Sequence, residues 1–214
     1  MRAADCMIQY PDLTYETCLW SHYRYVAGLD EAGRGALAGP VAVGAVILPK
    51  DEALLSRTLA GLRDSKQLTP LERDALSPRI EEAALAWSVG FAAAEEIDSD
   101  GIVCATRLAA LRALHGLAIS PQYLLTDFRL ELPQLEISQT SLVKGDALCL
   151  SIAAASVLAK KSRDQLMREL DLDYAGYGLG KHKGYGTLAH RTAMQRLGIS
   201  PVHRRSFHIK QCLK

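Results

Sequence analysis

Residues 26–40 decide the fold, and they read Val26-Ala-Gly-Leu-Asp30-Glu31-Ala-Gly33-Arg34-Gly35-Ala-Leu-Ala-Gly39-Pro40. An apolar run typical of a buried strand ends on two adjacent carboxylates, and a Gly-Arg-Gly turn follows at once. This turn places bare backbone N–H groups and one cation beside the two acids, which indicates metal-assisted chemistry on a phosphate. Each part also has a plainer interpretation, because adjacent acids often form a solvated turn and Gly-x-Gly is often only a tight bend.

The segment that follows the turn, Val41–Leu48, is continuously apolar, which predicts a second strand buried on both faces. Because about 10 residues connect it to the strand over 25–30, we expect an antiparallel pair in a buried sheet. Later signals predict an α/β arrangement whose elements are helix 15–23, helix 70–84, strand 87–94, helix 98–114, strand 121–127, strand 135–143, helix 147–159 and helix 188–197.

Local end signals support three of these helices. Thr69 is followed three residues later by Glu72, which is the spacing of a capping box. Asp98 is the expected cap of the helix over 98–114. Thr187 caps the last helix, and Gly198 closes it.

Two further acids, Asp127 and Asp146, stand at the ends of apolar elements, as Asp30 and Glu31 do. Asp146 precedes the Ala-rich, nearly uncharged run 147–159, so it could instead be a simple cap or dipole partner of that helix. In an α/β sheet the ends of neighbouring strands converge on one crevice. Four converging carboxylates need cations between them, and oxygen ligands without His or Cys select Mg²⁺ or Mn²⁺, typically as a two-metal site.

Charge divides the chain into two parts. Residues 160–214 hold 12 Lys and Arg against 4 Asp and Glu, whereas residues 1–159 hold 13 against 20. A cationic C-terminal part suits a polyanionic partner, although a charge run can also be only a solvated face. Residues 201–207 continue the basic surface. In the same part, Tyr185 lies between two glycines, where it either presents its ring to a sugar or base or anchors the loop on the core.

Composition sets the remaining limits. With 214 residues and 49% hydrophobic side chains, the chain can form one globular domain with a small appendage. Its five cysteines form neither a CxxC pair nor a zinc-spaced cluster, which favours reduced thiols and a cytoplasmic location. No apolar stretch approaches the roughly 20 residues that cross a bilayer, and we expect no membrane or export signal.

The ordered motifs together resemble ribonuclease HII, the type 2 ribonuclease H family, over about residues 24–207. They are Gly28-Leu-Asp30-Glu31-Ala-Gly33-Arg34-Gly35, Asp64-Ser65-Lys66, Leu-Thr-Asp127, Lys144-Gly-Asp146 with Ala153-Ala-Ala-Ser156 and Ala159-Lys160, and His182-Lys-Gly-Tyr185-Gly-Thr187. The resemblance implies a ribonuclease H-like mixed sheet flanked by helices, with a small helical C-terminal segment. It divides the chain into an N-terminal extension (1–22), a catalytic core (23–170) and a basic substrate-binding segment (171–214).

The resemblance also implies a metal-dependent endonuclease. It would cut the RNA strand of RNA/DNA hybrids and the 5′ side of single ribonucleotides in duplex DNA, leaving 3′-hydroxyl and 5′-phosphate ends, as ribonucleotide repair and primer removal in DNA replication require. The implied catalytic and metal-binding residues are Asp30, Glu31, Asp127 and Asp146. The implied substrate-binding residues are Gly33, Arg34 and Gly35 at the ribose 2′-hydroxyl, Lys66 at a phosphate, and Tyr185 at the junction with DNA. We expect a monomer, and nothing in the sequence supports a sliding clamp as a partner.

Two positions depart from the family pattern. Ala36 stands where proline is common, and Phe128 follows Asp127 where glycine is usual. A catalytically silent nucleic-acid-binding module is the alternative, but it is disfavoured because all four carboxylates are present. A Rossmann enzyme is disfavoured because the turn lacks G-x-G-x-x-G spacing and a strand follows it. The sister family ribonuclease HIII fits less well, because this turn reads Gly-Arg-Gly rather than Gly-Thr-Gly.

Overall fold

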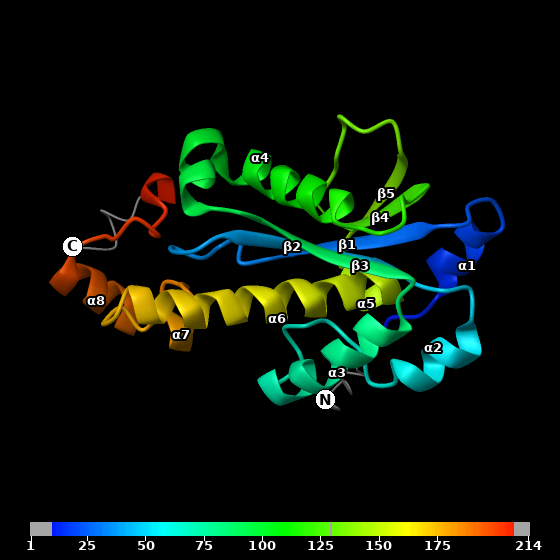
Figure 1. Cartoon of the computed structure of the whole chain (residues 1–214), viewed down its shortest axis with the longest axis horizontal. Coiled ribbons are helices and arrows are strands. Elements are labelled where there is room, and N and C mark those ends of the chain that lie inside the picture. The colour runs from blue at the N-terminus through cyan, green and yellow to red at the C-terminus, as the bar shows by residue number, and fades with distance from the viewer. Residues whose placement is uncertain (1–9, 129, 208–214) are drawn as a thin grey trace, which may run out of the picture.

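Five strands form one mixed sheet within residues 10–128 and 130–207, the part of the chain described by this computed structural model (Figure 1). Across the sheet the order is β3-β2-β1-β4-β5, with bounds β1 Val26–Ala32, β2 Val41–Ile47, β3 Ala86–Ala92, β4 Tyr123–Asp127 and β5 Ser138–Leu142. Strand β1 pairs antiparallel with β2 and parallel with β4. The predicted mixed sheet and its first antiparallel pair are thus confirmed.

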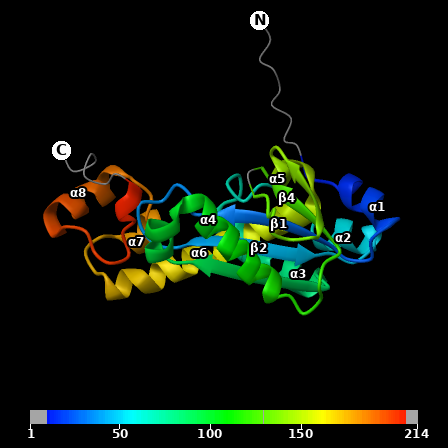
Figure 2. The same ribbon diagram turned by 90° about the horizontal axis from the view of Figure 1, so that it is seen from above.

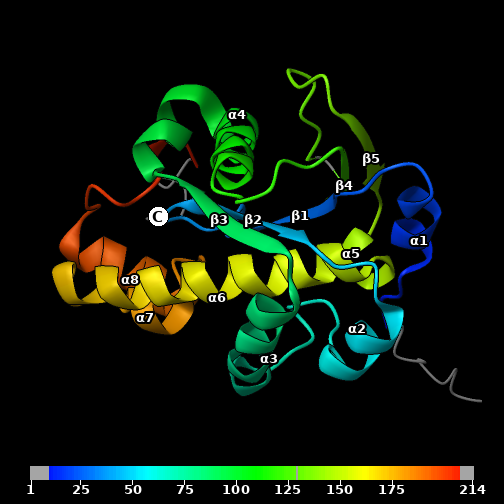
Figure 3. The same ribbon diagram turned by 45° about the vertical axis from the view of Figure 1, so that its right-hand side comes forward.

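Two long helices cover the sheet. Helix α4 (Ala94–His115) lies on one face and α6 (Leu150–Asp173) on the other (Figure 3). The shorter helices are α1 Thr14–Trp20, α2 Glu52–Thr58, α3 Pro70–Ala83, α5 Gly145–Leu148, α7 Leu179–His182, α8 Leu188–Leu197 and the 3₁₀ turn η1 Arg205–Phe207. Helices α7 and α8 gather at the opposite end of the molecule from α1 and α2 (Figure 2).

Helix α6 lies unusually close to the central strands because both surfaces carry small residues. A Cβ atom added at Gly28 of β1 would come within 2.3 Å of the Ser151 backbone, and one at Gly44 of β2 within 2.3 Å of the Ala155 carbonyl oxygen. Separate apolar clusters fill the space on each face of the sheet, one with α6 and α3 and the other with α4. The close contact places the charged half of α6 beside the end of β1.

Several helix ends agree with the sequence signals. Thr69 and Glu72 form the complete capping box of α3. The Thr187 side chain accepts a hydrogen bond from the His190 N–H at the start of α8, and Gly198 follows its last residue. The helix predicted over 15–23 is α1, and helix α2 was not predicted although the Asp51 side chain caps it.

The bounds of two predicted helices are wrong. Helix α4 begins at Ala94 rather than Asp98, because Glu96 reaches back to the Ala93 N–H, and the non-helical backbone of Gly101 (φ 80°, ψ 160°) divides it into two helical stretches. Asp98 instead accepts hydrogen bonds from the backbone N–H groups of Arg205 and Ser206. Helix α6 begins at Leu150 rather than 147, because the extended backbone of Cys149 separates it from α5, and it continues to residue 173 instead of ending at 159, since its second half is charged but stays helical.

The parts outside the central sheet attach directly to α6. The Asp12 backbone forms a bridge with Cys149, and buried Glu16 accepts a hydrogen bond from the Ser151 N–H. A small third core forms at the other end of α6, around Met167 and Met194. The division at residues 22 and 170 stays a prediction, and residues 1–9 and 208–214 lie outside the described chain. None of the described helices combines the length and apolarity that a membrane crossing requires.

Candidate active site

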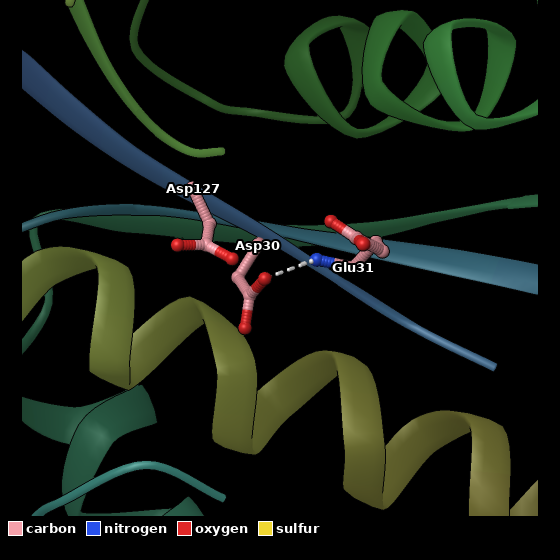
Figure 4. Close-up of side chains that lie close together, drawn as sticks. All are labelled: Asp30, Glu31 and Asp127. Atoms are coloured by element: carbon pink, nitrogen blue, oxygen red, sulfur yellow. Dashed lines mark hydrogen bonds between the residues drawn. The ribbon is translucent and has the colours of Figure 1, made fainter. Parts of the chain in front are cut away.

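Three of the four predicted carboxylates meet at the ends of two neighbouring strands. Asp30 and Glu31 belong to β1, and Asp127 is the last residue of β4, which runs parallel to β1. Each offers one oxygen, and the three oxygens lie within 4.8 Å of one another. Figure 4 shows that Asp30 and Asp127 come together beside the α6 helix, with an oxygen of Asp30 accepting a 2.7 Å hydrogen bond from the Glu31 N–H.

The fourth carboxylate, Asp146, lies in the short helix α5 beside this group. The Gly145 N–H, one residue earlier, donates a 2.7 Å hydrogen bond to Asp127 Oδ1, which joins α5 to the end of β4. Lys66 Nζ lies 3.2 Å from Asp146 Oδ2 and 3.8 Å from Asp64 Oδ1. The Asp64 side chain also accepts a hydrogen bond from the Lys66 N–H at 2.9 Å, so it orients this loop.

Burial and like charges make this cluster unfavourable in its ionised state. Burial, followed by the Glu31 charge, raises the pKa of Asp30 well above its usual value, while the Ser156 hydroxyl opposes the shift. Burial also raises the pKa of Glu31 despite the Arg34 charge, and that of Asp146 despite Lys66. A positive charge placed among these oxygens would oppose each shift, because it favours the ionised carboxylates.

The donor set fits a hard divalent cation. Among the described residues, Asp30 Oδ2 and Glu31 Oε2 are buried oxygens without a hydrogen-bond partner. Leaving such an acceptor unpaired costs about 1–3 kcal/mol, so native proteins rarely keep one without a reason. Carboxylate oxygens alone, with no His or Cys, are the ligands that Mg²⁺ and Mn²⁺ prefer.

The Gly-Arg-Gly turn begins the loop of residues 33–40, hereafter the ribose loop, which two buried arginines hold from beneath. Arg163 of α6 donates to the carbonyl oxygens of Pro40 at 2.8 Å and Ala38 at 3.1 Å. Arg204 donates to those of Gly39 at 2.9 Å and Arg34 at 2.8 Å. Neither arginine side chain is exposed, so the prediction that Arg204 belongs to the basic surface is wrong.

Gly33 is required by its position above Arg163. Its φ is 85°, and an added Cβ would lie 1.8 Å from Arg163 Nε. Gly35 differs, because a Cβ there would meet no atom within 4 Å. The Arg34 guanidinium reaches back to 3.7 Å from Glu31 Oε1. The turn therefore presents an open backbone at Gly35 and a cation near the carboxylates.

Tyr185 lies in the loop of residues 183–187, hereafter the tyrosine loop, which pairs with the ribose loop. The Leu37 N–H donates to the Gly184 carbonyl at 2.8 Å. The Tyr185 ring is 38% exposed, and the Lys160 Nζ and Arg163 Cζ atoms each lie 5.6 Å from its centroid. The ring is thus both accessible and flanked by cations, and the structure joins it to the Gly33–Gly35 turn.

Sequence reasoning missed Arg163, Arg204 and the histidines packed under the tyrosine loop. Arg163 interrupts the apolar periodicity of α6 only after residue 159, where the chain becomes generally charged, so it resembles an ordinary surface arginine. A signal did exist for the histidines, because His182, His190 and His203 cluster in the last quarter of the chain.

Comparison with known proteins agrees with this geometry. The family model for ribonuclease HII matches residues 27–210. Ribonuclease HII of Desulfitobacterium hafniense (strain Y51) is 52% identical over 196 residues, covering 91% of this chain and 73% of that protein. The corresponding protein of Dehalococcoides mccartyi (strain ATCC BAA-2266 / KCTC 15142 / 195) is 49% identical over 208 residues, covering 97% and 95%. The crystal structure of ribonuclease H2 from Pyrococcus horikoshii OT3 superposes with a TM-score of 0.71 at 26% identity, covering 88% of this chain and 97% of that one.

Proposed function

The chain belongs to the ribonuclease HII family of endonucleases that cut the RNA of RNA/DNA hybrids, and from this premise we propose that its catalytic centre is Asp30, Glu31, Asp127 and Asp146. The observation that carries the proposal is the meeting of three carboxylate oxygens within 4.8 Å, two of whose residues keep a buried oxygen without a partner. Asp146 completes the centre from α5. Its ion pair with Lys66 weakens its repulsion of the other three carboxylates.

The unpartnered oxygens of Asp30 and Glu31, with Asp127, would hold Mg²⁺ or Mn²⁺. When bound, a pair of such cations would supply Lewis-acid polarisation of the scissile phosphate and charge neutralisation at the leaving oxygen. The residues of the chain then orient the substrate: Lys66, whose side chain is 70% exposed, would place its ammonium against a neighbouring phosphate oxygen. We propose Mg²⁺ or Mn²⁺ as the bound metal.

The ribose loop would recognise the sugar on the 3′ side of the cut, which is the ribose of the ribonucleotide itself. Glycine backbone can approach a ribose closely, and the 2′-hydroxyl is the group that separates RNA from DNA. The support is the fixed shape of the loop, whose carbonyl groups are held by Arg163 and Arg204. A loop that is rigid before binding can discriminate by one hydroxyl, because no ordering cost offsets the contact.

Tyr185 would stack near the sugar that follows the ribonucleotide. Its half-exposed ring, flanked by the Lys160 and Arg163 cations, suits a nucleic-acid backbone that carries one phosphate per sugar. This arrangement favours cleavage on the 5′ side of a single ribonucleotide in duplex DNA, with 3′-hydroxyl and 5′-phosphate products.

A nicking assay tests the proposal. Purified protein with Mg²⁺ or Mn²⁺ is incubated with duplex DNA that contains one ribonucleotide, with an RNA/DNA hybrid, and with the all-DNA duplex. We expect the first two to be cut and the third to stay intact, with all cleavage lost in chelator. An intact single-ribonucleotide duplex with both metals, while the hybrid is cut, would contradict the proposed substrate.

The role of Tyr185 has its own test. Tyr185→Ala should lower cleavage at a single ribonucleotide by about tenfold, the scale of one lost stacking contact, and affect long hybrids less. Tyr185→Phe keeps the ring and serves as the matched control. Equal losses on both substrates would refute the junction role.

A further inference from the structure

Two buried histidines face each other beneath the tyrosine loop. His190 of α8 and His203 have no exposed surface, and their Nε2 atoms lie 3.1 Å apart. The His190 Nδ1 atom lies 3.0 Å from the Tyr185 carbonyl oxygen, so the pair reaches the backbone of the tyrosine itself. Neither histidine is exposed to substrate, so any role in recognition must pass through the loop.

The hydrogen bonds favour one arrangement of protons. The Ser200 N–H donates to His203 Nδ1 at 3.0 Å, and the Ser200 hydroxyl lies 2.8 Å from the same nitrogen, which makes this nitrogen the acceptor of both. Neutral His203 therefore carries its proton on Nε2 and donates it to His190 Nε2. His190 must then carry its own proton on Nδ1, which it donates to the Tyr185 carbonyl. A directed chain runs from Ser200 to Tyr185.

A third histidine holds the residue before the tyrosine. The Gly184 N–H donates to His182 Nδ1 at 3.3 Å, and His182 Nε2 lies 2.8 Å from the Tyr177 carbonyl oxygen. The His182 ring stacks on His190 with 4.3 Å between centroids. Imidazole rings therefore fix the backbone on both sides of the Gly184–Tyr185 peptide.

The same contacts connect the tyrosine loop to the ribose loop. Gly184 accepts the Leu37 N–H, and the backbone of Ala38 forms a bridge with His203 itself. Arg204, the next residue, donates to the Arg34 carbonyl. A shift in the His190–His203 pair would therefore change the position of Tyr185 relative to the Gly33–Gly35 turn.

We propose that His190 and His203 are positioning residues for substrate discrimination, because their directed hydrogen-bond chain fixes the position of Tyr185 relative to the Gly33–Gly35 turn of the ribose loop. The inference rests on the junction role proposed for Tyr185. It predicts that the chain matters for a single ribonucleotide in DNA, where the junction must be recognised, and much less for a continuous RNA/DNA hybrid. A purely structural role predicts equal losses on both substrates.

The proton arrangement can be measured in the unmodified protein. Long-range ¹H–¹⁵N correlation spectra of histidine-labelled protein at pH 7 should show His203 as the Nε2–H tautomer and His190 as the Nδ1–H tautomer. The opposite tautomer at either residue would overturn the proposal, and this result does not depend on whether any variant folds.

Two variants at one position separate the two ends of the His190 ring. His190→Asn places an amide N–H near the Nδ1 position and keeps a donor for the Tyr185 carbonyl. His190→Gln extends an amide to the Nε2 position and keeps a partner for His203 but loses that donor. We expect His190→Gln to lower the ratio of single-ribonucleotide to hybrid kcat/KM by about tenfold, the scale of one buried hydrogen bond. His190→Asn should keep the ratio within about twofold.

Tyr185→Ala in the same assay distinguishes the two proposals. If Tyr185→Ala lowers the ratio and His190→Gln does not, the positioning role is overturned and the junction role stands. If Tyr185→Ala leaves the ratio unchanged, the junction role fails, and the positioning role fails with it. Equal losses on both substrates in His190→Gln, with a lowered Tm, would show a structural role only and would also overturn the proposal.

Discussion

Buried acceptor oxygens stay unpaired in the carboxylate cluster, whereas in the recognition loops the backbone acceptors are paired with buried donors. At the ends of β1 and β4, acids repel one another and two oxygens meet no partner among the described residues. In the recognition loops, defined as the ribose loop, the tyrosine loop and residues 200–204, carbonyl oxygens are paired with buried arginine and histidine donors. The carboxylate cluster therefore lacks the positive charge that would stabilise it, whereas the recognition loops have a fixed shape before substrate binds.

This difference separates chemistry from recognition. A centre that must bind cations has to keep acceptors available, and the cost appears as raised carboxylate pKa values. A loop that discriminates by one hydroxyl must keep its geometry without substrate, and buried hydrogen bonds provide that rigidity. Changes in the first region should affect activity more than stability, whereas changes in the second should affect both.

The largest effect is expected at Asp30. Asp30→Asn removes one charge from the cluster, and we expect cleavage to fall by about 10³-fold or more because several kcal/mol of electrostatic stabilisation depend on the bound cations. In metal-free buffer, the same variant should unfold at a higher urea concentration than the unaltered protein. The reason is that a neutral amide avoids the burial cost and the repulsion that the ionised Asp30 carboxylate meets. Cleavage rates and urea unfolding in chelator measure the two effects.

Asp74→Asn is the matched control, since Asp74 is an exposed aspartate on α3. It should change neither quantity. Undiminished cleavage by Asp30→Asn, or a clear loss of stability in metal-free buffer, would remove the contrast between the two regions.

A glycine pair tests the recognition loops. Gly33→Ala forces a Cβ onto Arg163 at a positive φ, so we expect about 4 kcal/mol of lost stability from overpacking and backbone strain together. Gly35→Ala, two residues away, meets open space and should unfold like the unaltered protein. If Gly35 approaches the ribose as proposed, Gly35→Ala should still weaken binding to the single-ribonucleotide duplex in an anisotropy titration. Equal stability of the two variants would show that Arg163 does not constrain the turn.

The two regions should respond to pH in opposite directions. Burial, with the His182 charge, lowers the pKa of His190 to about 4, and burial lowers that of His203. Between about pH 6.5 and 4, His190 binds a proton in the unfolded chain but not in the folded protein. Acid therefore lowers the free energy of unfolding by up to about 3 kcal/mol through this residue. The raised pKa of Asp30 and of Glu31 acts oppositely, because acid neutralises their repulsion in the folded protein.

The difference in unfolding free energy between the unaltered protein and His190→Gln isolates the histidine contribution. The titratable side chains packed on the pair, His182 against His190 and Tyr177 against His203, are present in both proteins. Metal-free urea unfolding from pH 7 to 4.5 should show the advantage of His190 shrinking as the pH falls. A constant difference would mean that His190 has the same pKa in the folded and unfolded states.

The smallest expected effect is at Lys66. Its ammonium supplies part of the positive charge near Asp146, so Lys66→Met should let the carboxylates bind Mn²⁺ about threefold more tightly, the scale of one partly exposed ion pair. Calorimetric titration measures the affinity, and Lys161→Met, whose lysine pairs with Glu81, is the control. Weaker Mn²⁺ binding by Lys66→Met would show that Lys66 orients the ligands rather than competing with the cation.

Local signals predicted much of the fold and part of the site. The apolar run before Asp30, the capping box at Thr69 and the cap at Thr187 all depend on residues close together in the chain, and the structure confirms them. The start of α4 was wrong for an instructive reason. Asp98 has the composition of a cap, but its carboxylate binds the backbone of residues 205–206 from the far end of the chain.

The buried arginines mark where local reasoning fails. A charged side chain in sequence predicts exposure, and only the folded chain shows that Arg163 and Arg204 each find several carbonyl oxygens. All of those carbonyls except that of Lys183 belong to segments more than a hundred residues distant, so no periodicity or spacing could connect them.

By itself the amino-acid sequence determined most of the segments that become strands and helices, and which acids stand at their ends, because caps, turns and periodicity are short-range properties. The sequence predicted that Asp127 and Asp30 converge, but only the tertiary structure decided the parallel register, pairing Leu29 with Thr126, that brings them together. It also decided that two buried histidines meet beneath Tyr185, with their Nε2 atoms 3.1 Å apart. Both depend on long-range packing, in which burial removes water and leaves each polar atom only the partners that the fold brings to it.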